Sequence, residues 1–334
     1  VLMADQIYNA SLIEALWEKI VPDGYVLMEG GRHPTKLIRL KDDIVGLAFQ
    51  FPKNVRLGEI SSLGFSVELK DEGDSKELTI LKNPGSDQSI FSSLAANLLG
   101  LSFDTKEENA GNRFKSLISR IKAWQKFMAI RGRKLDQKAQ MGIFGELTVL
   151  EFLLSNGQRS TGFTDFWTGP LRDSHDFKVS DSEYLEVKTS LKDNPFEITV
   201  DSLLQFDHGP EEHLFLAAVL CSNQEDGVNI SDLGDRIKSR LSNKLDVIEF
   251  ESLLMSAGLG QIEKKEELYK FVCNGMSFYD VSKLPRITPS SIHGILSAKY
   301  KITLTTEDGE FWTPPLSKEE YLLLLREREL NGIN

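Results

Sequence analysis

The stretch from residue 136 to residue 221 constrains the fold most, because helical and strand patterns follow one another there in a definite order. A helical pattern covers 136–155 and is closed by Asn156-Gly157. Three short strand patterns, a brief helical pattern and the most apolar strand of the chain follow, at 163–167, 176–179, 184–189, 201–206 and 213–221. Strands mixed with helices at these spacings predict an α/β (α+β) core in which helices cover a sheet.

The flanking segments predict a division into three domains. Residues 1–110 alternate in the manner of short antiparallel strands, which predicts an N-terminal β-rich domain for recognition or docking. Residues 111–225 contain the central core with a basic leading helix, and residues 226–334 a C-terminal α/β extension. Outside the core we expect helices near 7–20, 90–99, 114–128, 232–241, 247–257 and after Ser317, and strands at 25–28, 37–40, 44–49, 65–69, 78–81, 268–273 and 298–304.

Composition limits the class of protein. The 334 residues, 40% of them hydrophobic, suffice for two or three folded domains. The two cysteines, Cys221 and Cys273, are too few and too far apart in sequence for a disulfide framework or a four-cysteine zinc site, and they suit a reducing compartment. The apolar runs fall far short of the roughly 20 residues that cross a bilayer, and the N-terminus lacks a signal-peptide pattern. We therefore expect a cytoplasmic protein with no membrane contact.

Charge is distributed unevenly along the chain. The 39 Lys and Arg against 50 Asp and Glu give a net charge of −11, which by itself argues against nucleic-acid binding. Residues 112–135, however, contain eight basic side chains and no acidic one, which leaves about −19 for the rest (−11 − 8 = −19). Such a segment is either a solvated helix face or a face that contacts DNA phosphates. The candidates for DNA contact are Lys115, Lys122, Lys126, Arg131, Arg133 and Lys134.

One strand pattern of the core places two charged side chains on the same face. Alternation along the strand directs Glu186 and Lys188 to one side, and Asp176 lies ten residues before Glu186. Two converging carboxylates provide the oxygen ligands that Mg²⁺ prefers, and an adjacent lysine can orient an attacking water. The triplet alone is a weak signal, since Glu68 and Lys70 repeat it on another strand, where a solvated polar face is the simpler interpretation.

A glutamate on the preceding helix strengthens the interpretation of this region as an active site. The neighbours of Glu146 at helical spacing are apolar or small, so its carboxyl group lies on the inward stripe of the helix. Burying such a charge costs free energy unless the group is paired or close to a metal. The plain alternative is a buried glutamate paired with one arginine. Gly142 and Gly145 on the same helix predict a close approach of its backbone to the sheet.

Together these residues resemble the PD-(D/E)XK restriction-like nucleases. That superfamily has an αβββαβ core with a glutamate on the first helix, an aspartate on the second strand and (D/E)-x-K on the third, and Glu146, Asp176, Glu186 and Lys188 match this pattern. The resemblance implies a restriction-endonuclease-like fold and Mg²⁺-dependent DNA hydrolysis, with Mn²⁺ as a substitute. It also implies that Asp176, Glu186 and the Val187 carbonyl hold the metal, that Lys188 positions the attacking water, and that Glu146 binds a second ion or orients a water.

Further motifs narrow the resemblance to a bacterial branch of the superfamily. The segments at 142–147, 175–177, 185–188, 279–281 and 284–287 are similar to PD-(D/E)XK motif proteins of restriction-modification-like phage-defence loci. This similarity implies the nuclease subunit of such a system, with DNA, a helicase-like ATPase and a DNA methyltransferase as partners, and it leaves a homodimer open. The alternatives are a non-catalytic DNA-binding or scaffold subunit and an RNA nuclease.

Two auxiliary residues and one geometric condition complete the prediction. His175 either contacts phosphate or the neighbouring aspartate, or is an ordinary residue at a strand end, and Gln205 follows the motif strand where related nucleases often have a polar residue. In a regular hairpin with an even loop, Asp176 would face Val187 on the wrong side of the sheet. The metal site therefore requires an odd loop or a bulge between 179 and 184, which brings the aspartate to the motif face.

Overall fold

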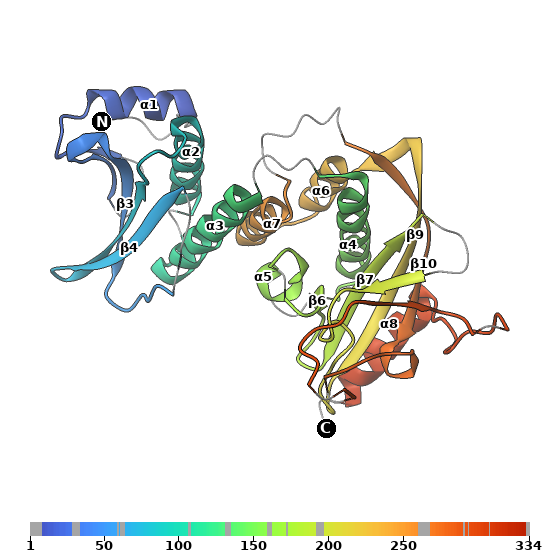
Figure 1. The fold of residues 1–334 in the computed structure, drawn as a ribbon. Helices are drawn as coiled ribbons and strands as arrows, with labels where there is room; N and C mark the ends of the chain where they lie inside the picture. The colour runs from blue at the N-terminus through green and yellow to red at the C-terminus, as the bar shows by residue number, and fades with distance from the viewer. Residues whose placement is uncertain are drawn as a thin grey trace. The chain divides into compact units, whose positions relative to one another are not determined.

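A computed structural model describes residues 9–28, 34–58, 60, 64–105, 108–130, 135–158, 162–171, 173–191, 197–259, 268–289, 291–292, 294–306 and 308–331. The chain forms two compact units. Unit 1 comprises Val1–Arg133 and Asn243–Gly258, and unit 2 comprises Lys134–Ser242 and Leu259–Asn334 (Figure 1). Within the described ranges, every helix is too short or too polar to cross a lipid bilayer.

Unit 1 is built on a five-stranded sheet in the order β1-β2-β3-β5-β4, in which every neighbouring pair is antiparallel. The short alternating runs of the N-terminal region form this sheet. Its strands are β1 (Gly24–Met28), β2 (Thr35–Arg39), β3 (Val45–Pro52), β4 (Phe65–Glu72) and β5 (Ser75–Lys82), and its helices are α1 (Ala10–Lys19), α2 (Gln88–Asp104), α3 (Ala110–Ile130) and α7 (Lys244–Ser256).

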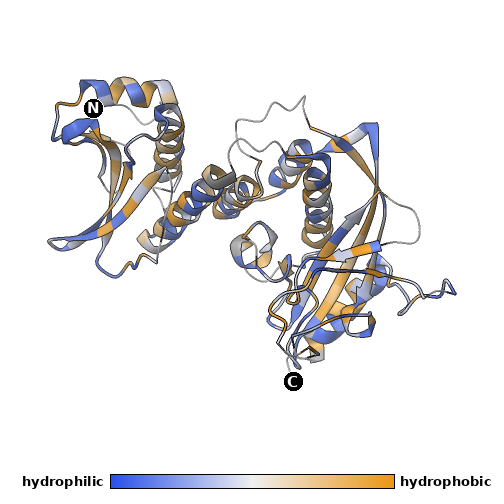
Figure 2. Ribbon diagram, viewed as in Figure 1, coloured by the Kyte–Doolittle hydropathy of each residue, from blue (hydrophilic) through white to orange (hydrophobic). Residues whose placement is uncertain are grey.

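Apolar side chains from the sheet and the helices meet in the core of unit 1. Leu47 and Phe49 of β3 are fully buried. Trp17 of α1 stacks on Phe91 of α2 with ring centroids 5.6 Å apart, and its Nε1 donates a hydrogen bond to the Gly46 carbonyl at 3.2 Å. Figure 2 shows hydrophobic and hydrophilic residues alternating along α1, as expected of a helix with one buried side.

Unit 2 contains a four-stranded mixed sheet in the order β10-β9-β7-β6 and a separate two-stranded ribbon of β8 and β11. Strand β9 pairs parallel with β7 and antiparallel with β10, and β6 pairs antiparallel with β7. The strands are β6 (Phe177–Lys178), β7 (Glu183–Ser190), β8 (Glu197–Val200), β9 (His213–Asn229), β10 (Lys270–Asp280) and β11 (Tyr300–Thr303), and the helices are α4 (Gln137–Ser155), α5 (Phe163–Phe166), α6 (Ile230–Lys238) and α8 (Lys318–Asn331).

The C-terminal helix α8 is held on the larger sheet of unit 2 by a ring stack and by an ion pair to a buried carboxylate. Tyr321 stacks on Phe278 of β10, with ring centroids 4.1 Å apart. Arg328 lies 2.7 Å from the buried carboxylate of Glu183 at the start of β7. The closing helix therefore completes the same core that carries the motif strand.

Two predicted elements of the core are wrong. The strand expected at 163–167 is the short helix α5, followed by one isolated bridge from Trp167 to Phe177. Phe163, Phe166 and Trp167 are all fully buried, and this i, i+3, i+4 spacing suits a helical turn better than a strand. The helix expected at 201–206 is a run of turns, because so short a segment gains few hydrogen bonds against the cost of helix nucleation.

The division into units differs from the three predicted domain ranges. The basic helix α3 belongs to unit 1, where it packs with α2 and α7. Helix α7 comes from the predicted C-terminal extension, and Arg120 of α3 binds its Ser252 and Glu251 at 2.8 and 3.1 Å. The rest of the extension joins unit 2, since β10 pairs with β9 along most of its length.

The tertiary structure brings the two cysteines of the chain together. Cys221 of β9 and Cys273 of β10 are direct partners in the antiparallel register, and both are free thiols. Burial raises the pKa of the Cys221 thiol to about 12, so this group stays protonated at neutral pH. Because the two cysteines are far apart in sequence, no local pattern predicted that they would be neighbours.

Candidate active site

Strand β7 carries the charged pair that the sequence singles out. The Lys188 Nζ lies 2.8 Å from Glu186 Oε1, and only 3% of the Glu186 side chain and 18% of the Lys188 side chain are exposed. The pair Glu68 and Lys70 on β4 has the same spacing, but its side chains are 50% and 72% exposed. Burial therefore separates the candidate pair from a solvated pair with the same sequence pattern.

The hairpin between β6 and β7 has the irregularity that the metal site requires. Phe177 pairs with Leu185, and just beyond β6 the Val179 N–H binds the Glu183 carbonyl at 2.8 Å, which leaves a three-residue loop at 180–182. The odd loop length brings Asp176 opposite Glu186 on the motif face. The predicted irregularity is confirmed.

Backbone groups of two neighbouring segments hold Asp176 in place. Its Oδ2 accepts a hydrogen bond from the Val187 N–H at 2.8 Å, and its carbonyl accepts from the N–H groups of Thr168 and Gly169 at 2.9 and 3.0 Å. In a strand, the N–H and C=O groups of one residue point the same way. The Val187 carbonyl therefore points to the side of β7 on which Asp176 lies.

Glu146 of α4 faces the same site. Its Oε2 accepts a hydrogen bond from Trp167 Nε1 at 2.8 Å. A Cβ atom placed on Gly169 would lie 2.6 Å from Glu146 Oε2 and 2.7 Å from Asp176 Oδ1. The two carboxylates therefore converge on the space that a side chain at this position would fill. A buried glutamate paired with an arginine exists elsewhere in this unit, at Glu183, whereas Glu146 lies beside a second carboxylate.

The two glycines of α4 have different surroundings. A Cβ at Gly145 would overlap the hydroxyl group of Thr189 on β7, so the predicted close approach is confirmed there. At Gly142 a Cβ would meet no described atom within 4 Å, and the prediction is wrong for this residue. Gly145 thus allows α4 to carry Glu146 close to the motif strand.

Burial raises the pKa of each carboxyl group in the site, and repulsion from Asp176 adds to it for Glu146 and Glu186. Burial, with a further contribution from Asp176, raises the pKa of Glu186 to about 8. Burial also raises the pKa of Asp176 and, together with the Asp176 charge, places the pKa of Glu146 well above its usual value. For Lys188, burial lowers the pKa, but Glu186 and Asp176 outweigh burial and leave the pKa above its usual value. Three acidic groups against one ammonium group create a site that favours an added cation.

The three carboxylates are the kind of donor set that a hard divalent cation takes. One oxygen of each is engaged, by Trp167, by the Val187 N–H and by Lys188 respectively. Within the part of the chain that the structure describes, no three or more His, Cys, Asp or Glu side chains are already spaced as metal ligands. The excess negative charge and the oxygen chemistry nonetheless fit such an ion.

Of the two auxiliary residues, only Gln205 joins the site. Its Oε1 accepts hydrogen bonds from Lys188 Nζ at 3.3 Å and from the Asp201 N–H at 2.7 Å. His175 lies elsewhere: its Nε2 donates to the Asp207 carbonyl at 3.1 Å and its ring packs on Tyr184. These contacts are those of an ordinary structural histidine.

Sequence reasoning missed three groups that shape the site. Trp167 donates a hydrogen bond to Glu146, and Gly169 leaves room for the carboxylates of Glu146 and Asp176. The third group is Asp201, whose pKa is lowered mainly by its hydrogen bond with Lys299 and further by the charge of nearby Lys188. The buried i, i+3, i+4 aromatic spacing ending at Trp167 was the available signal. The other two depend on tertiary contacts alone.

Three of the six basic residues predicted to contact DNA, Lys115, Lys122 and Lys126, lie on α3 of unit 1. Lys115 and Lys122 are exposed and seven residues apart, hence on one face of the helix, and Lys126 is partly buried. Arg113 and Arg120, which contribute to the same positive segment, are buried and bind partners inside unit 1. Part of the positive charge therefore serves the core. Outside the described residues lie Arg131, Arg133 and Lys134.

Comparison with known proteins identifies a family. A family model described as "Putative PD-(D/E)XK family member, (DUF4420)" matches residues 37–305, a range that contains all residues of the candidate site. No curated protein matches the chain, and no solved structure does.

Proposed function

Because the chain belongs to the PD-(D/E)XK family DUF4420, we propose that it is a nuclease that hydrolyses phosphodiester bonds in DNA with the help of a divalent metal ion. One observation carries the proposal: Asp176, buried Glu186 and partly buried Lys188 share one site with Glu146 of α4. The αβββαβ core of restriction-like nucleases belongs to this proposal: α4, β6, β7 and β9 match four of its elements in order, while α5 stands in place of the first strand and turns stand in place of the second helix.

The residues that would hold the ion are Asp176, Glu186, Glu146 and the carbonyl group of Val187. Their oxygens suit Mg²⁺, and Mn²⁺ can take its place. When bound, the ion supplies Lewis-acid stabilisation of the charge that develops on the phosphate. The raised pKa values of the carboxyl groups favour protons in the absence of metal, so we expect metal affinity to increase with pH.

Lys188 provides the positive charge of the site. Its raised pKa keeps the side chain protonated at neutral pH, which suits it to position the attacking water and to offset transition-state charge. Glu186 and Gln205 hold its ammonium group from two sides, at 2.8 and 3.3 Å. Glu146, oriented by Trp167, would bind a second ion or orient a water.

Nicking of supercoiled plasmid DNA in Mg²⁺ or Mn²⁺ tests this function. We expect Lys188→Ala and Asp176→Ala each to lower the nicking rate by about 100-fold or more, the usual loss when one electrostatic group of an active site is removed. Lys70→Ala is the matched control, since it removes an exposed lysine from the same Glu-x-Lys pattern. Equal rates for wild type, Lys188→Ala and Asp176→Ala would reject the nuclease assignment.

The biological setting is part of the proposal. We infer a subunit of a restriction or phage-defence system that acts with a helicase-like ATPase and a DNA methyltransferase, in the cytoplasm. The net charge of −11 supports dependence on such partners, because an acidic chain is repelled by DNA. We expect the isolated chain to nick slowly and the partner proteins, added together, to raise its rate; no change on their addition would contradict this setting.

A further inference from the structure

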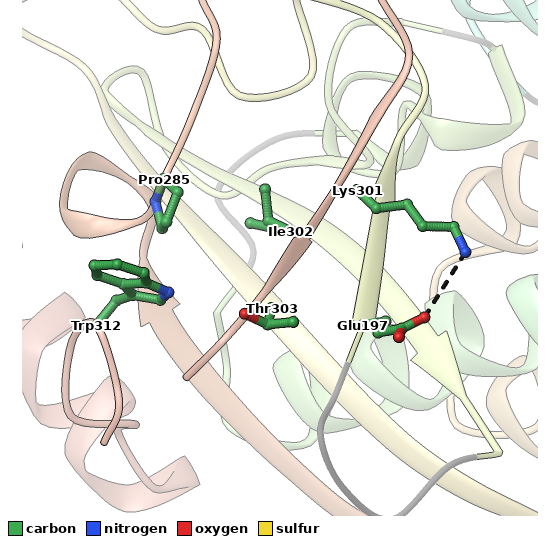
Figure 3. Close-up of a pocket in the computed structure, with 6 residues that line it drawn as sticks. All are labelled: Glu197, Pro285, Lys301, Ile302, Thr303 and Trp312. Atoms are coloured by element: carbon green, nitrogen blue, oxygen red, sulfur yellow. Dashed lines mark ion pairs between the residues drawn. The ribbon is translucent and has the colours of Figure 1, made fainter. Parts of the chain in front are cut away.

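A pocket of about 380 Å³ opens on the two-stranded ribbon of unit 2, in a region that the proposed catalytic residues do not use. Figure 3 shows its lining, with the indole ring of Trp312 and the ring of Pro285 on one side and the ion pair of Glu197 and Lys301 on the other. Ile302 and Thr303 of β11 lie between them.

Trp312 differs from every other tryptophan of the chain. Trp17, Trp124 and Trp167 are at most 5% exposed, whereas Trp312 is 47% exposed. An exposed indole ring offers a flat apolar face on which a planar ligand can stack. Its backbone N–H binds the Leu304 carbonyl at 3.2 Å, so the ring is carried by a segment paired with the end of the ribbon.

The opposite side of the pocket offers an acceptor and a donor side by side. The Lys301 Nζ lies 3.7 Å from Glu197 Oε2. A carboxylate accepts from the ring N–H and amino groups of nucleobases, and an ammonium group donates to their carbonyl oxygens and ring nitrogens. A stacking surface facing a paired donor and acceptor is therefore complementary to a base whose hydrogen-bonding edge is free.

The ribbon connects this pocket with the candidate active site. Residues alternate along β8 and β11, so Glu197 and Lys301 share the outward face, while Ile198, Val200 and Ile302 pack inward. That face leads along β8 to Asp201, whose N–H binds the same Gln205 oxygen as Lys188.

The distance along the ribbon suits one nucleic-acid strand. Glu197 and Asp201 are four residues apart, roughly 13 Å along a strand. A few nucleotides, at about 3.4 Å or more each, span that length. A backbone bound at the candidate active site could therefore place one of its bases in the pocket.

We propose that this pocket binds an unpaired nucleobase of the strand that is cut, by stacking on Trp312 and by hydrogen bonds to Glu197 and Lys301. The inference rests on the proposed nuclease function and names its substrate as a nucleic acid with a single-stranded region. A base within a duplex cannot enter, because its edge is already paired and its faces are stacked.

Tryptophan fluorescence tests the pocket without any cleavage. In EDTA, we titrate wild type, Trp312→Phe, Trp312→Ala and Lys301→Glu with a 12-nucleotide single strand, of DNA or of RNA, and with the same sequence as a DNA duplex. The single strand should quench the wild-type emission, and Trp312→Phe should abolish the quenching, since the remaining tryptophans are buried. The DNA and RNA titrations decide which strand is preferred.

Binding of a labelled strand gives the affinities of all variants. Trp312→Ala should weaken single-strand binding about 5- to 150-fold, the range measured for base stacking, and leave duplex binding unchanged. Lys301→Glu keeps the fluorophore and should also weaken single-strand binding. Unchanged single-strand affinity in Trp312→Ala, or an equal loss for duplex, overturns the proposal; unchanged thermal midpoints show that the variants are folded.

The nicking assay separates the two proposals. If wild type nicks plasmid DNA, Lys188→Ala does not, and Trp312→Ala binds single strands as wild type does, the base pocket fails and the nuclease function stands. If Lys188→Ala nicks as wild type does, the nuclease function fails, whatever the fluorescence shows.

Discussion

At the scale of single residues, burial decides which charged groups can act. The chain carries the Glu-x-Lys pattern on β4 and on β7. Both side chains of the β4 pair are at least half exposed, whereas those of the β7 pair are mostly shielded from solvent. There Glu186 is crowded by Asp176, and the cost of burying its charge appears as a pKa raised to about 8. The same crowding of carboxyl groups is the reason that we propose a cation there.

The raised pKa of Glu186 predicts how stability depends on pH. The ordinary value is 4.5, so between about pH 5 and 8 the folded chain keeps a proton that the unfolded chain has lost. The free energy of unfolding of the metal-free protein therefore falls as pH rises through this range. Glu186→Gln removes this titration and should reduce the fall by about 1 kcal/mol or more.

Denaturant unfolding in EDTA at several pH values measures this effect. Glu68→Gln is the matched control and should leave the pH dependence as in wild type, because Glu68 is half exposed. An identical pH dependence in Glu186→Gln and wild type would contradict the assignment of a buried, proton-binding carboxyl group.

At the scale of elements, the contact between α4 and β7 assembles the site. Helix α4 carries Glu146 and β7 carries Glu186 and Lys188, and the two elements meet where Gly145 lies against Thr189. Among the described residues the buried Thr189 hydroxyl has no hydrogen-bond partner, which costs free energy at this close contact. The three-residue loop between β6 and β7 then brings in Asp176.

A pair of glycine substitutions on α4 tests this contact. Gly145→Ala should lower the free energy of unfolding by about 1–3 kcal/mol, because its Cβ overlaps Thr189. Gly142→Ala, on the same helix with open space around it, should raise stability by roughly 0.5–1 kcal/mol. Both values come from denaturant unfolding.

The double variant Gly145→Ala, Thr189→Ala provides the control for that pair. Removing the Thr189 side chain relieves the overlap, so the double variant should recover part of the stability lost in Gly145→Ala. A Gly145→Ala protein as stable as Gly142→Ala would show that α4 does not approach β7 so closely.

At the scale of the whole molecule, the positive charge of α3 is divided between the core of unit 1 and its surface. The positive segment at 112–135 looks like one basic face in sequence, yet Arg113 and Arg120 turn into the core of unit 1. On the described part of α3, the exposed lysines that stay candidates for DNA contact include Lys115 and Lys122. The candidate catalytic groups lie in unit 2, so the two roles belong to different units.

Reversal of the exposed charges on α3 tests the DNA-contact role. Lys115→Glu with Lys122→Glu should weaken DNA binding and reduce the slope of log affinity against log salt by roughly 1 for each lysine. Lys53→Glu with Lys70→Glu is the matched control, since it reverses two exposed lysines of the same unit, one directly after β3 and one on β4. Equal slopes for both double variants would show that the exposed lysines of α3 do not contact DNA.

Local patterns in the sequence predicted many of the helices and strands of this protein and its family. Strand alternation and helix spacing predicted the N-terminal strands, α4, β7 and β9, and the Glu-x-Lys motif with Asp176 indicated the family and the need for an odd loop. These features follow from side-chain periodicity within one segment, which a sequence displays directly. Where a segment was too short for periodicity to decide, at 163–167 and 201–206, the prediction failed.

Contacts between distant segments were decided only by the tertiary structure. The pairing of Cys221 with Cys273, the bond from Trp167 to Glu146 and the turn of Arg120 into the core each join residues that no local pattern relates. The pocket beside Trp312 likewise exists because β8 and β11, about 100 residues apart in sequence, form one ribbon. The sequence shows which groups are present, but burial, which sets their pKa values and charges, arises only when distant elements pack together.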